Sequence, residues 1–432
     1  MSPIEWPKVK LADYVDLLSG FPFKSAGFST AFDDIPLVKG ENVHQGFIDW
    51  NKAKRWPKNQ VAELDKYRLK PGDVVLAMDR PWIEAGLKQA CIREHDPSSL
   101  LVQRVSRLRG ENGLLTDYLR HLIGSSMFTD YIKPIVTGTS VPHISGAQIK
   151  GFAFRLPPPP TQRRIASILS AYDDLIENNT RRIAILEEMA RRLYEEWFVR
   201  FRFPGHEGVP LVESEFGLVP QGWESRSVAE LAIIHRGRSY KGTELADTGG
   251  LPFINLKCMV RDGGYRASGL KSYTGVFKQT QTVRAGEMVM AITDMTQERR
   301  LVAHVGRVSR LDADFGVFSM DLVRVEPRDH MPESYIYAML RWSGFADQVK
   351  QHANGANVLH LLPARIDEYR LICPTSEVAQ RFGELVSPMF ALCEALEQKN
   401  QNLRTTRDLL LPKLISGELD VSTLPEPLAE AA

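Results

Sequence analysis

Basic side chains interleaved with tryptophans are the residues whose types could bind a polyanion. Lysine and arginine contact phosphates through charge, and side chains that reach base edges choose a sequence. Trp50 and Trp56 lie among the basic residues of the first half. Candidate nucleic-acid contacts are Lys24, Lys39, Lys52, Lys54, Arg55 and Lys58, then Arg236, Arg238, Lys241, Arg299, Arg300, Arg307 and Arg310. Scattered basic residues are commonly just solvated surface, so the clusters are a firmer prediction than any single member.

Two short loops of small polar residues around a glycine form a sharper candidate. Their candidate contacts are Thr137, Gly138, Thr139, Ser140, Asn354, Gly355 and Asn357. Glycine permits a tight turn, and N–H groups and hydroxyls near the surface suit a phosphate. The alternative is structural: Val141 and Val358 fill each core, while His143 and His360 pack against the neighbouring helix. Metal binding by these histidines is not expected, because no further ligands lie at the required spacing.

Motifs for catalysis are missing from the sequence. There is no Asp/Asn-Pro-Pro-Tyr-like segment for amino methylation, no glycine-rich turn for S-adenosylmethionine and no P-loop for ATP. Carboxylate pairs such as Asp33-Asp34 and Asp173-Asp174 are more typical of a turn and a solvated helix face than of an acid/base site. We therefore expect a chain that is not an enzyme and holds no cofactor or metal itself.

Composition sets broad limits. The 432 residues are 43% hydrophobic, enough for more than one core, and the net charge of +1 can still hide a basic face. The four cysteines are scattered and indicate neither a metal site nor a disulfide framework, which favours the cytosol. The sequence shows no signal peptide and no apolar run long enough to cross a bilayer, so we expect a cytoplasmic protein without a membrane partner.

An internal repeat organises the chain. Residues 103–157 align without a gap with residues 320–374, at an offset of 217 that also relates Trp6 to Trp223. A repeat of this size indicates two copies of one structural unit.

Each copy has the pattern of a mixed α/β domain. Short apolar runs after a glycine, such as 73–78 and 287–292, are typical of buried strands. The centres of the copies, roughly 41–100 and 257–318, share almost no identity. Two domains of one fold that differ in such segments suggest two binding domains that recognise different ligands.

A long amphipathic helix is predicted after each copy, over 161–203 and 377–416. Apolar residues recur there at three- and four-residue steps, the pattern of a helix with an apolar seam. The expected seam residues are Ile165, Ile168, Tyr172, Ile176, Ile183, Leu186, Leu193 and Trp197, and in the second helix Phe382, Leu385, Met389, Leu392, Leu396, Leu403, Leu410 and Leu414. A seam roughly 50 Å long needs a partner, so we expect the helices to pair antiparallel. Such pairing would place the domains at opposite ends of a rod, about an approximate twofold axis.

The helix boundaries and one seam position add further predictions. Thr161 is the expected N-cap, and Pro204-Gly205 should end one continuous helix. Pro388 and Pro412 predict a kink or break in the second helix. Asn179 lies on the first seam, where a buried polar residue would select one register; a surface position at the seam edge is the equal alternative.

Several motifs resemble the specificity (S) subunit of type I restriction-modification systems. Residues 217–223, Gly-Leu-Val-Pro-Gln-Gly-Trp, resemble the entry to a second target recognition domain, and 411–419, Leu-Pro-Lys-Leu-Ile-Ser-Gly-Glu-Leu, resemble the distal conserved end. Residues 156–162 and Trp197-Phe198 resemble the central conserved region. The resemblance covers essentially the whole chain, although Trp6 lacks the Val-Pro-Gln-Gly equivalent before it.

This resemblance implies an α+β fold: two similar mixed α/β target recognition domains separated by two long antiparallel helices. The implied division is domain 1 at 1–156, the central helix at 157–203, domain 2 at 204–374, the distal helix at 375–420 and a disordered tail at 421–432. In the family, each domain reads half of a split DNA sequence. The helices dock two modification (methyltransferase) subunits and, through them, restriction (motor-nuclease) subunits. S-adenosylmethionine, ATP and Mg²⁺ are then expected on the partner subunits.

Two other classes of function compete with this interpretation. A self-sufficient methyltransferase or nuclease with a divergent motif would bind S-adenosylmethionine tightly on its own. A structural adaptor that used the helices only for assembly would show no sequence-specific DNA binding, and it would leave the duplicated, divergent domains unexplained.

Overall fold

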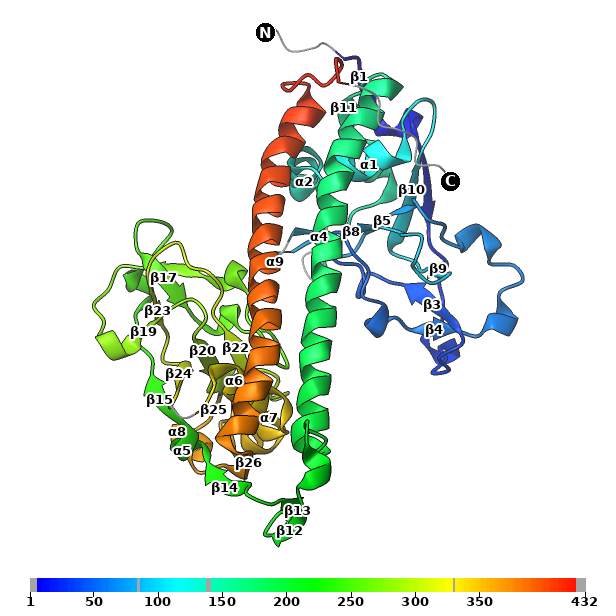
Figure 1. Ribbon diagram of the computed structural model, residues 1–432. Helices are drawn as coiled ribbons and strands as arrows, with labels where there is room; N and C mark the ends of the chain where they lie inside the picture. The colour runs from blue at the N-terminus through cyan, green and yellow to red at the C-terminus, as the bar shows by residue number, and fades with distance from the viewer. Residues whose placement is uncertain (1–5, 84–85, 137–140, 329–330, 425–432) are drawn as a thin grey trace. The chain divides into compact units, whose positions relative to one another are not determined.

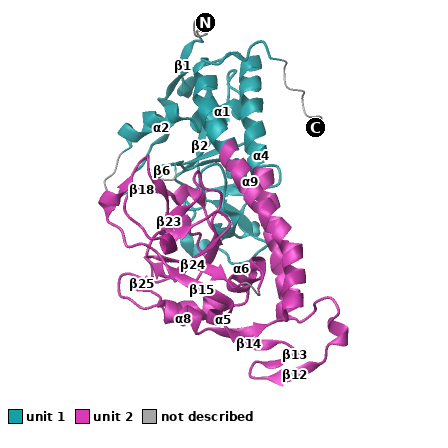
Figure 2. Cartoon of the chain, turned by 60° about the vertical axis from the view of Figure 1, so that its left-hand side comes forward, with its two compact units in different colours: residues 1–176, 403–432 teal, residues 177–402 magenta. Residues whose placement is uncertain are grey.

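A computed structural model of the protein describes residues 6–83, 86–136, 141–328 and 331–424 (Figure 1). The chain divides into two compact units, 1–176 with 403–432, and 177–402 (Figure 2). Each unit holds one copy of the repeat and part of each long helix. Within the described part of the chain, no helix combines the length and the apolar composition that crossing a bilayer requires.

The first unit is built on an antiparallel four-stranded sheet in the order β2-β10-β5-β8. Its strands are β2 (Val15–Ser19), β5 (Val74–Ala77), β8 (Gln89–Cys91) and β10 (Val105–Gly110). A smaller sheet, β4-β3-β9, is formed by β3 (Ile35–Val38), β4 (Arg55–Trp56) and β9 (Leu100–Leu101). The remaining elements of this copy are β1 (Lys8–Lys10), β6 (Trp82–Ile83), β7 (Gly86–Leu87), α1 (Thr116–Ile123), α2 (Ser126–Ile132), α3 (Gly146–Lys150) and β11 (Ala153–Arg155). Val74, Leu76 and Leu108 of the main sheet form one core with Tyr118 and Phe128 from α1 and α2.

The second unit repeats this plan. Its main sheet has the order β15-β24-β20-β22, with β15 (Ala232–Arg236), β20 (Met288–Ala291), β22 (Val305–Arg307) and β24 (Leu322–Pro327). Its second sheet has the order β16-β18-β17-β23-β19, with β16 (Leu245–Ala246), β17 (Leu251–Ile254), β18 (Lys271–Tyr273), β19 (Thr282–Val283) and β23 (Gly316–Phe318). The remaining elements are β12 (Leu211–Ser214), β13 (Gly217–Pro220), β14 (Glu224–Ser227), α5 (Val228–Leu231), β21 (Thr293–Asp294), α6 (Glu333–Trp342), α7 (Phe345–Val349), β25 (Leu359–His360), α8 (Pro363–Asp367) and β26 (Arg370–Cys373).

The repeat seen in the sequence is therefore a repeat of structure. Strand β24 begins 217 residues after β10, and α6 begins 217 residues after α1. Strand pair β14–β26 corresponds in the same way to β1–β11. The second sheets differ, with three strands in the first unit and five in the second, and they lie where the two sequences diverge. The expected fold class of two mixed α/β domains, with a long helix between them in the chain, is confirmed.

The long helices are α4 (Pro159–Tyr194) and α9 (Ser376–Ser416). The N-cap prediction for Thr161 is wrong, because the helix begins two residues earlier. Proline is tolerated in a first turn, where its missing N–H has no helical partner. At the other end, α4 passes into a π-helical turn, Glu195–Val199, so the helix is neither uniform nor as long as expected.

Helix α9 is continuous through both of its internal prolines, so the expected break does not occur. Each proline removes one helical hydrogen bond. The carbonyl groups that lose their partners belong to Glu384 and Asp408, which are both exposed, so water can reach them.

Candidate nucleic-acid interface and helix pair

The two long helices pair antiparallel within each unit. In the second unit, Asn179 meets Asn400, the Ile183 carbonyl lies 3.9 Å from the Cys393 sulfur, and the Tyr194 and Phe382 rings are 6.2 Å apart. The partner number falls as the first number rises, which is the signature of antiparallel packing. In the first unit, Arg407 donates to Asp173 at 2.7 Å.

Most predicted seam residues are buried or half-buried. On α4 these are Ile165, Ile168, Tyr172, Ile176, Ile183, Leu186, Leu193 and, in the π-turn, Trp197; on α9 they are Phe382, Met389, Leu396, Leu403, Leu410 and Leu414. Helical periodicity was sufficient to find this face, because apolar residues three and four positions apart lie on one side of a helix, and that side is the one that packs.

Two predicted seam positions are wrong. Leu385 and Leu392 are 48% and 39% exposed, whereas their neighbours Val386 and Cys393 are buried. Val386 belongs to the core cluster that also contains Phe382 and residues of α6. Leu385 and Leu392 fit the helical spacing of the seam. Packing against the domain instead buries the next residue along the helix at both places.

Asn179 and Asn400 form a buried polar contact in the seam. Their side chains are 4% and 2% exposed, and the Asn179 Nδ2 donates to the Asn400 Oδ1 at 2.9 Å. The Asn400 Nδ2 donates in turn to the Thr180 hydroxyl at 3.2 Å. The interpretation of Asn179 as a buried seam residue is therefore confirmed, and its partner amide opposes any other alignment of the two helices.

Replacing Asn179 alone by leucine is expected to lower the free energy of unfolding by about 1–3 kcal/mol, because the buried Asn400 Oδ1 loses the hydrogen bond that Asn179 donates. Replacing both asparagines by leucine should cost less than the single change, since no buried amide oxygen is then left without the bond from Asn179. Urea denaturation of the two single variants and the double variant gives the coupling, with the exposed Asn178→Leu as control. Additive effects would contradict a direct interaction.

Charged groups join each domain to the helices. In the first unit, Arg120 of α1 donates to the Ser170 hydroxyl at 2.9 Å and to Asp173 at 3.4 Å on α4. Beside it, burial and the nearby Arg120 lower the pKa of His121 well below its usual value, so the imidazole is neutral at pH 7. In the second unit, Arg341 of α6 lies 3.3 Å from Glu187. These contacts orient each domain on its helices.

Arg307 also belongs to this joint and is a poor DNA candidate. Its guanidinium lies 3.2 Å from Glu394 of α9 and against the rings of Tyr337 and Phe390. The expectation that Arg307 contacts nucleic acid is therefore replaced by a structural role.

The basic candidates of the first domain gather around the small β4-β3-β9 sheet. Lys24, Lys54 and Lys58 are exposed. Lys39 pairs with Glu41 at 3.1 Å and Lys52 with Asp49 at 2.8 Å. A further exposed side chain, not predicted as a contact, joins this group: Phe32 is 84% exposed, and the Arg55 guanidinium lies 4.8 Å from its ring centre.

The basic candidates of the second domain fall into two kinds. Arg236, Lys241 and Arg310 are exposed. The others are held by neighbours: Arg238 by the Tyr273 hydroxyl at 3.2 Å, Arg299 by Gln351 at 2.8 Å, and Arg300 by Asp262 at 3.0 Å. The exposed members keep a side chain available to a ligand.

Of the two glycine loops, only the second can be placed, because Thr137, Gly138, Thr139 and Ser140 are outside the described residues. In the second domain, Asn354 and His360 exchange two backbone hydrogen bonds, and Asn357 between them is exposed. Gly355 has a φ of +150°, and a Cβ there would lie 1.9 Å from the Val358 carbonyl oxygen. The glycine is therefore required by the turn.

The structural alternative for the histidines is wrong in its details. Val141 is 38% exposed and does not fill the core. The His143 Nδ1 lies 2.7 Å from the Asp79 carboxylate, at the end of β5. Partial burial raises the pKa of Asp79, but hydrogen bonds from Arg104 and His143 outweigh it and hold that pKa below its usual value.

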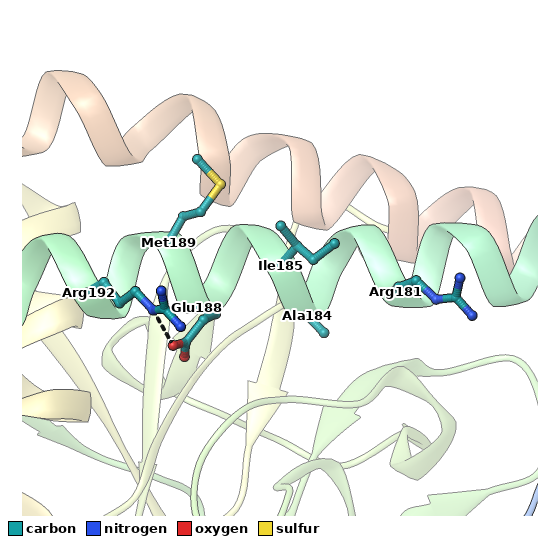
Figure 3. A pocket seen from close by; sticks show the side chains of 6 residues that line it. All are labelled: Arg181, Ala184, Ile185, Glu188, Met189 and Arg192. Atoms are coloured by element: carbon teal, nitrogen blue, oxygen red, sulfur yellow. Dashed lines mark hydrogen bonds and ion pairs between the residues drawn. The ribbon is translucent and has the colours of Figure 1, made fainter. Parts of the chain in front are cut away.

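An exposed apolar patch lies on α4 (Figure 3). Ile185 and Met189, one helical turn apart, are 53% and 47% exposed, and they line a shallow hollow with Ala184, Arg181, Glu188 and Arg192. The Arg192 guanidinium donates to Glu188 at 2.6 Å. Exposed apolar side chains framed by charges are typical of a surface that another protein covers.

Two copies of one mixed domain, each packed on parts of two shared helices, define a duplicated binding protein. The family described as "Type I restriction modification DNA specificity domain" matches residues 3–188 and 220–405, and the chain belongs to this family. The resemblance drawn from the sequence motifs is thereby confirmed.

Two relatives align with more than nine tenths of the chain. The MjaIX specificity subunit of Methanocaldococcus jannaschii is 26% identical and aligns with 98% of this chain and 95% of its own. The HindI specificity subunit of Haemophilus influenzae is 22% identical over 91% and 97%. The crystal structure of a type I restriction-modification S subunit from M. genitalium covers 98% of this chain and 100% of its own, with a TM-score of 0.58 at 14% identity, and supports the fold.

Proposed function

We propose that this chain is the DNA-reading specificity subunit of a type I restriction-modification complex, with each domain reading one half of a split target. The observation that carries the proposal is the repeated domain. The main sheet and its helices recur at a constant offset, whereas the second sheet has three strands in one copy and five in the other. A shared scaffold with a different periphery suits two readers of different sequences.

The helix pair is the proposed docking site for two modification subunits, which in turn hold the restriction subunits. The patch at Ile185 and Met189 supports this role, as do the exposed leucines Leu175 and Leu392, which are equivalent in the repeat. S-adenosylmethionine, ATP and Mg²⁺ would be bound by those partners, and the complex would work in the cytoplasm, where its DNA lies. The specificity subunit itself is not catalytic.

Exchange of residues 1–156 for the first domain of another specificity subunit is the experiment that tests this function. We expect only one half of the methylated motif to change, because the other half is read by residues 204–374. Single-molecule methylome sequencing of a host expressing the chain with its modification subunit measures both halves at once.

Three other outcomes would contradict the proposal. A change in both halves would contradict independent reading by the two domains. An assembled complex that binds S-adenosylmethionine but methylates no split motif would favour an assembly adaptor. Tight binding of S-adenosylmethionine by the purified chain alone would favour an enzyme.

A further inference from the structure

Three chain segments meet at the end of β5 in the first unit. Asp79 follows β5, Arg104 precedes β10, and His143 precedes α3. The Arg104 Nη1 donates to Asp79 at 2.7 Å, and the His143 Nδ1 lies 2.7 Å from the other carboxylate oxygen. These three residues are called the first strand-end triad.

The same three backbone positions meet in the second unit, at Thr293, Asp321 and His360. In the first unit, Met78 donates its N–H to the Arg104 carbonyl at 2.8 Å and accepts from Ile144 at 2.9 Å. In the second, Ile292 donates to the Asp321 carbonyl at 2.9 Å and accepts from Leu361 at 2.8 Å. The backbone hydrogen bonds therefore establish the equivalence residue by residue.

The histidine recurs, and the other two positions change chemistry. The Thr293 hydroxyl lies 3.4 Å from the His360 Nδ1, in the place that Asp79 occupies beside His143. Arg104 of the first unit is replaced by an aspartate, Asp321. Residues that serve the repeated core are kept instead: Tyr118 and Tyr335 are both fully buried, as are Phe128 and Phe345. Divergence at a place where the backbone is preserved points to selection for different ligands.

The first triad is also placed to meet a ligand. The Arg104 side chain is 64% exposed and that of His143 is 38% exposed. Arg104 has a φ of +66° and the neighbouring exposed Arg80 a φ of +44°, a backbone region that costs free energy for residues with a side chain. Strained, exposed arginines beside a divergent pair are typical of a recognition site.

We propose that the two strand-end triads are DNA contacts of the two domains, each with a histidine. Arg104 and Asp79 select bases in the first domain, and Asp321 does so in the second, where Thr293 is buried beside His360. The inference rests on the proposed function. In a major groove, arginine pairs with guanine, and aspartate accepts from the cytosine amino group. The histidine donates to a phosphate in both domains, which positions each domain without choosing a sequence.

Installing the second triad in the first domain tests this inference. The double variant Asp79→Thr/Arg104→Asp recreates the chemistry that the second domain already accommodates. We expect the first half-site to change at one or two positions, with methylation of the original half-site reduced about tenfold or more, while the second half-site stays the same. The control is Arg68→Asp, which removes another arginine of the first domain that is held by an aspartate and a hydroxyl.

Two further variants separate recognition from folding. Arg104→Ala removes an exposed side chain and leaves the contact between Asp79 and His143, so it should relax the first half-site at one position. His143→Ala should reduce methylation of an unchanged motif. Methylome sequencing measures the motif, and thermal unfolding of the purified chain measures its stability.

The result that would overturn the inference is specific. If the wild-type chain directs a split motif, and folded Arg104→Ala and Asp79→Thr/Arg104→Asp direct that same motif to the same extent, the triads do not read DNA. If only Arg104→Ala folds, an unchanged motif overturns the inference equally. A wild-type chain that directs no split motif would instead contradict the proposed function itself.

Discussion

Replacing Phe382 by alanine is expected to lower the free energy of unfolding by about 3–5 kcal/mol, the largest loss for any single change considered for this chain. Phe382 is fully buried where α9 meets the end of α4 and α6. Its ring centre lies 4.9 Å from that of Phe198, 5.8 Å from that of Trp197 and 6.4 Å from that of Tyr335. Alanine would lose these contacts and leave a cavity that rigid aromatic neighbours fill poorly.

Urea denaturation of the full chain measures this loss, with Phe216→Ala as the matched control. Phe216 lies in the same unit but is 50% exposed, so its truncation should change the free energy of unfolding by no more than about 0.5 kcal/mol. Hydrogen exchange in α6 should report the loss as well, because Phe382 packs in the same core as this helix. Equal stability of the two variants would show that Phe382 does not anchor this joint.

Glutamate at both Ile185 and Met189 is expected to weaken assembly with the modification subunit by about 100-fold or more. Both side chains are exposed, so the chain should keep its fold. In a complex, each new carboxylate would have to lose its water in the place of an apolar side chain, and Arg192 beside it is already paired with Glu188. Methylation should fall with assembly, while the methylated motif stays the same.

Co-purification with the modification subunit, followed by titration of the purified proteins, measures this effect. The control is Asn178→Glu, a similar added charge at an exposed position of the same helix. Full assembly of the double glutamate variant would show that the patch at Ile185 and Met189 does not contact the modification subunit. The exposed Leu385 and Leu392 of α9 would then be the next positions to change.

The sequence was sufficient for features that depend on repetition and on local periodicity. The 217-residue offset predicted two copies of one domain, because equivalent residues keep their spacing when a whole unit is duplicated. The long helices were predicted from apolar residues three and four positions apart, because residues at this spacing lie on one face when the backbone is an α-helix. The same steps placed Asn179 on the seam or at its edge, and the structure decided that it is buried.

Boundaries and exact contacts depended on what the helices pack against. The choice of Val386 over Leu385 was decided by the core shared with α6, and periodicity cannot distinguish neighbours that differ by one step. The first turn of α4 contains Pro159 and Pro160, although the sequence predicted that the helix would begin after them, at Thr161. From the sequence, Arg307 was a candidate DNA contact on the surface, yet the fold places it against Glu394 and two aromatic rings.

The strand-end triads show the same division most clearly. Asp79, Arg104 and His143 are separated by 25 and 39 residues, and the offset between the copies slips before Asp79, so no spacing rule connects them or pairs Asp79 with Thr293. By itself, the sequence determined that there are two similar domains, two long helices and no catalytic motif, because repetition, periodicity and motifs are local properties of a chain. Only the tertiary structure decided which side chains meet, because pairing of β5 with β10 brings distant strand ends together.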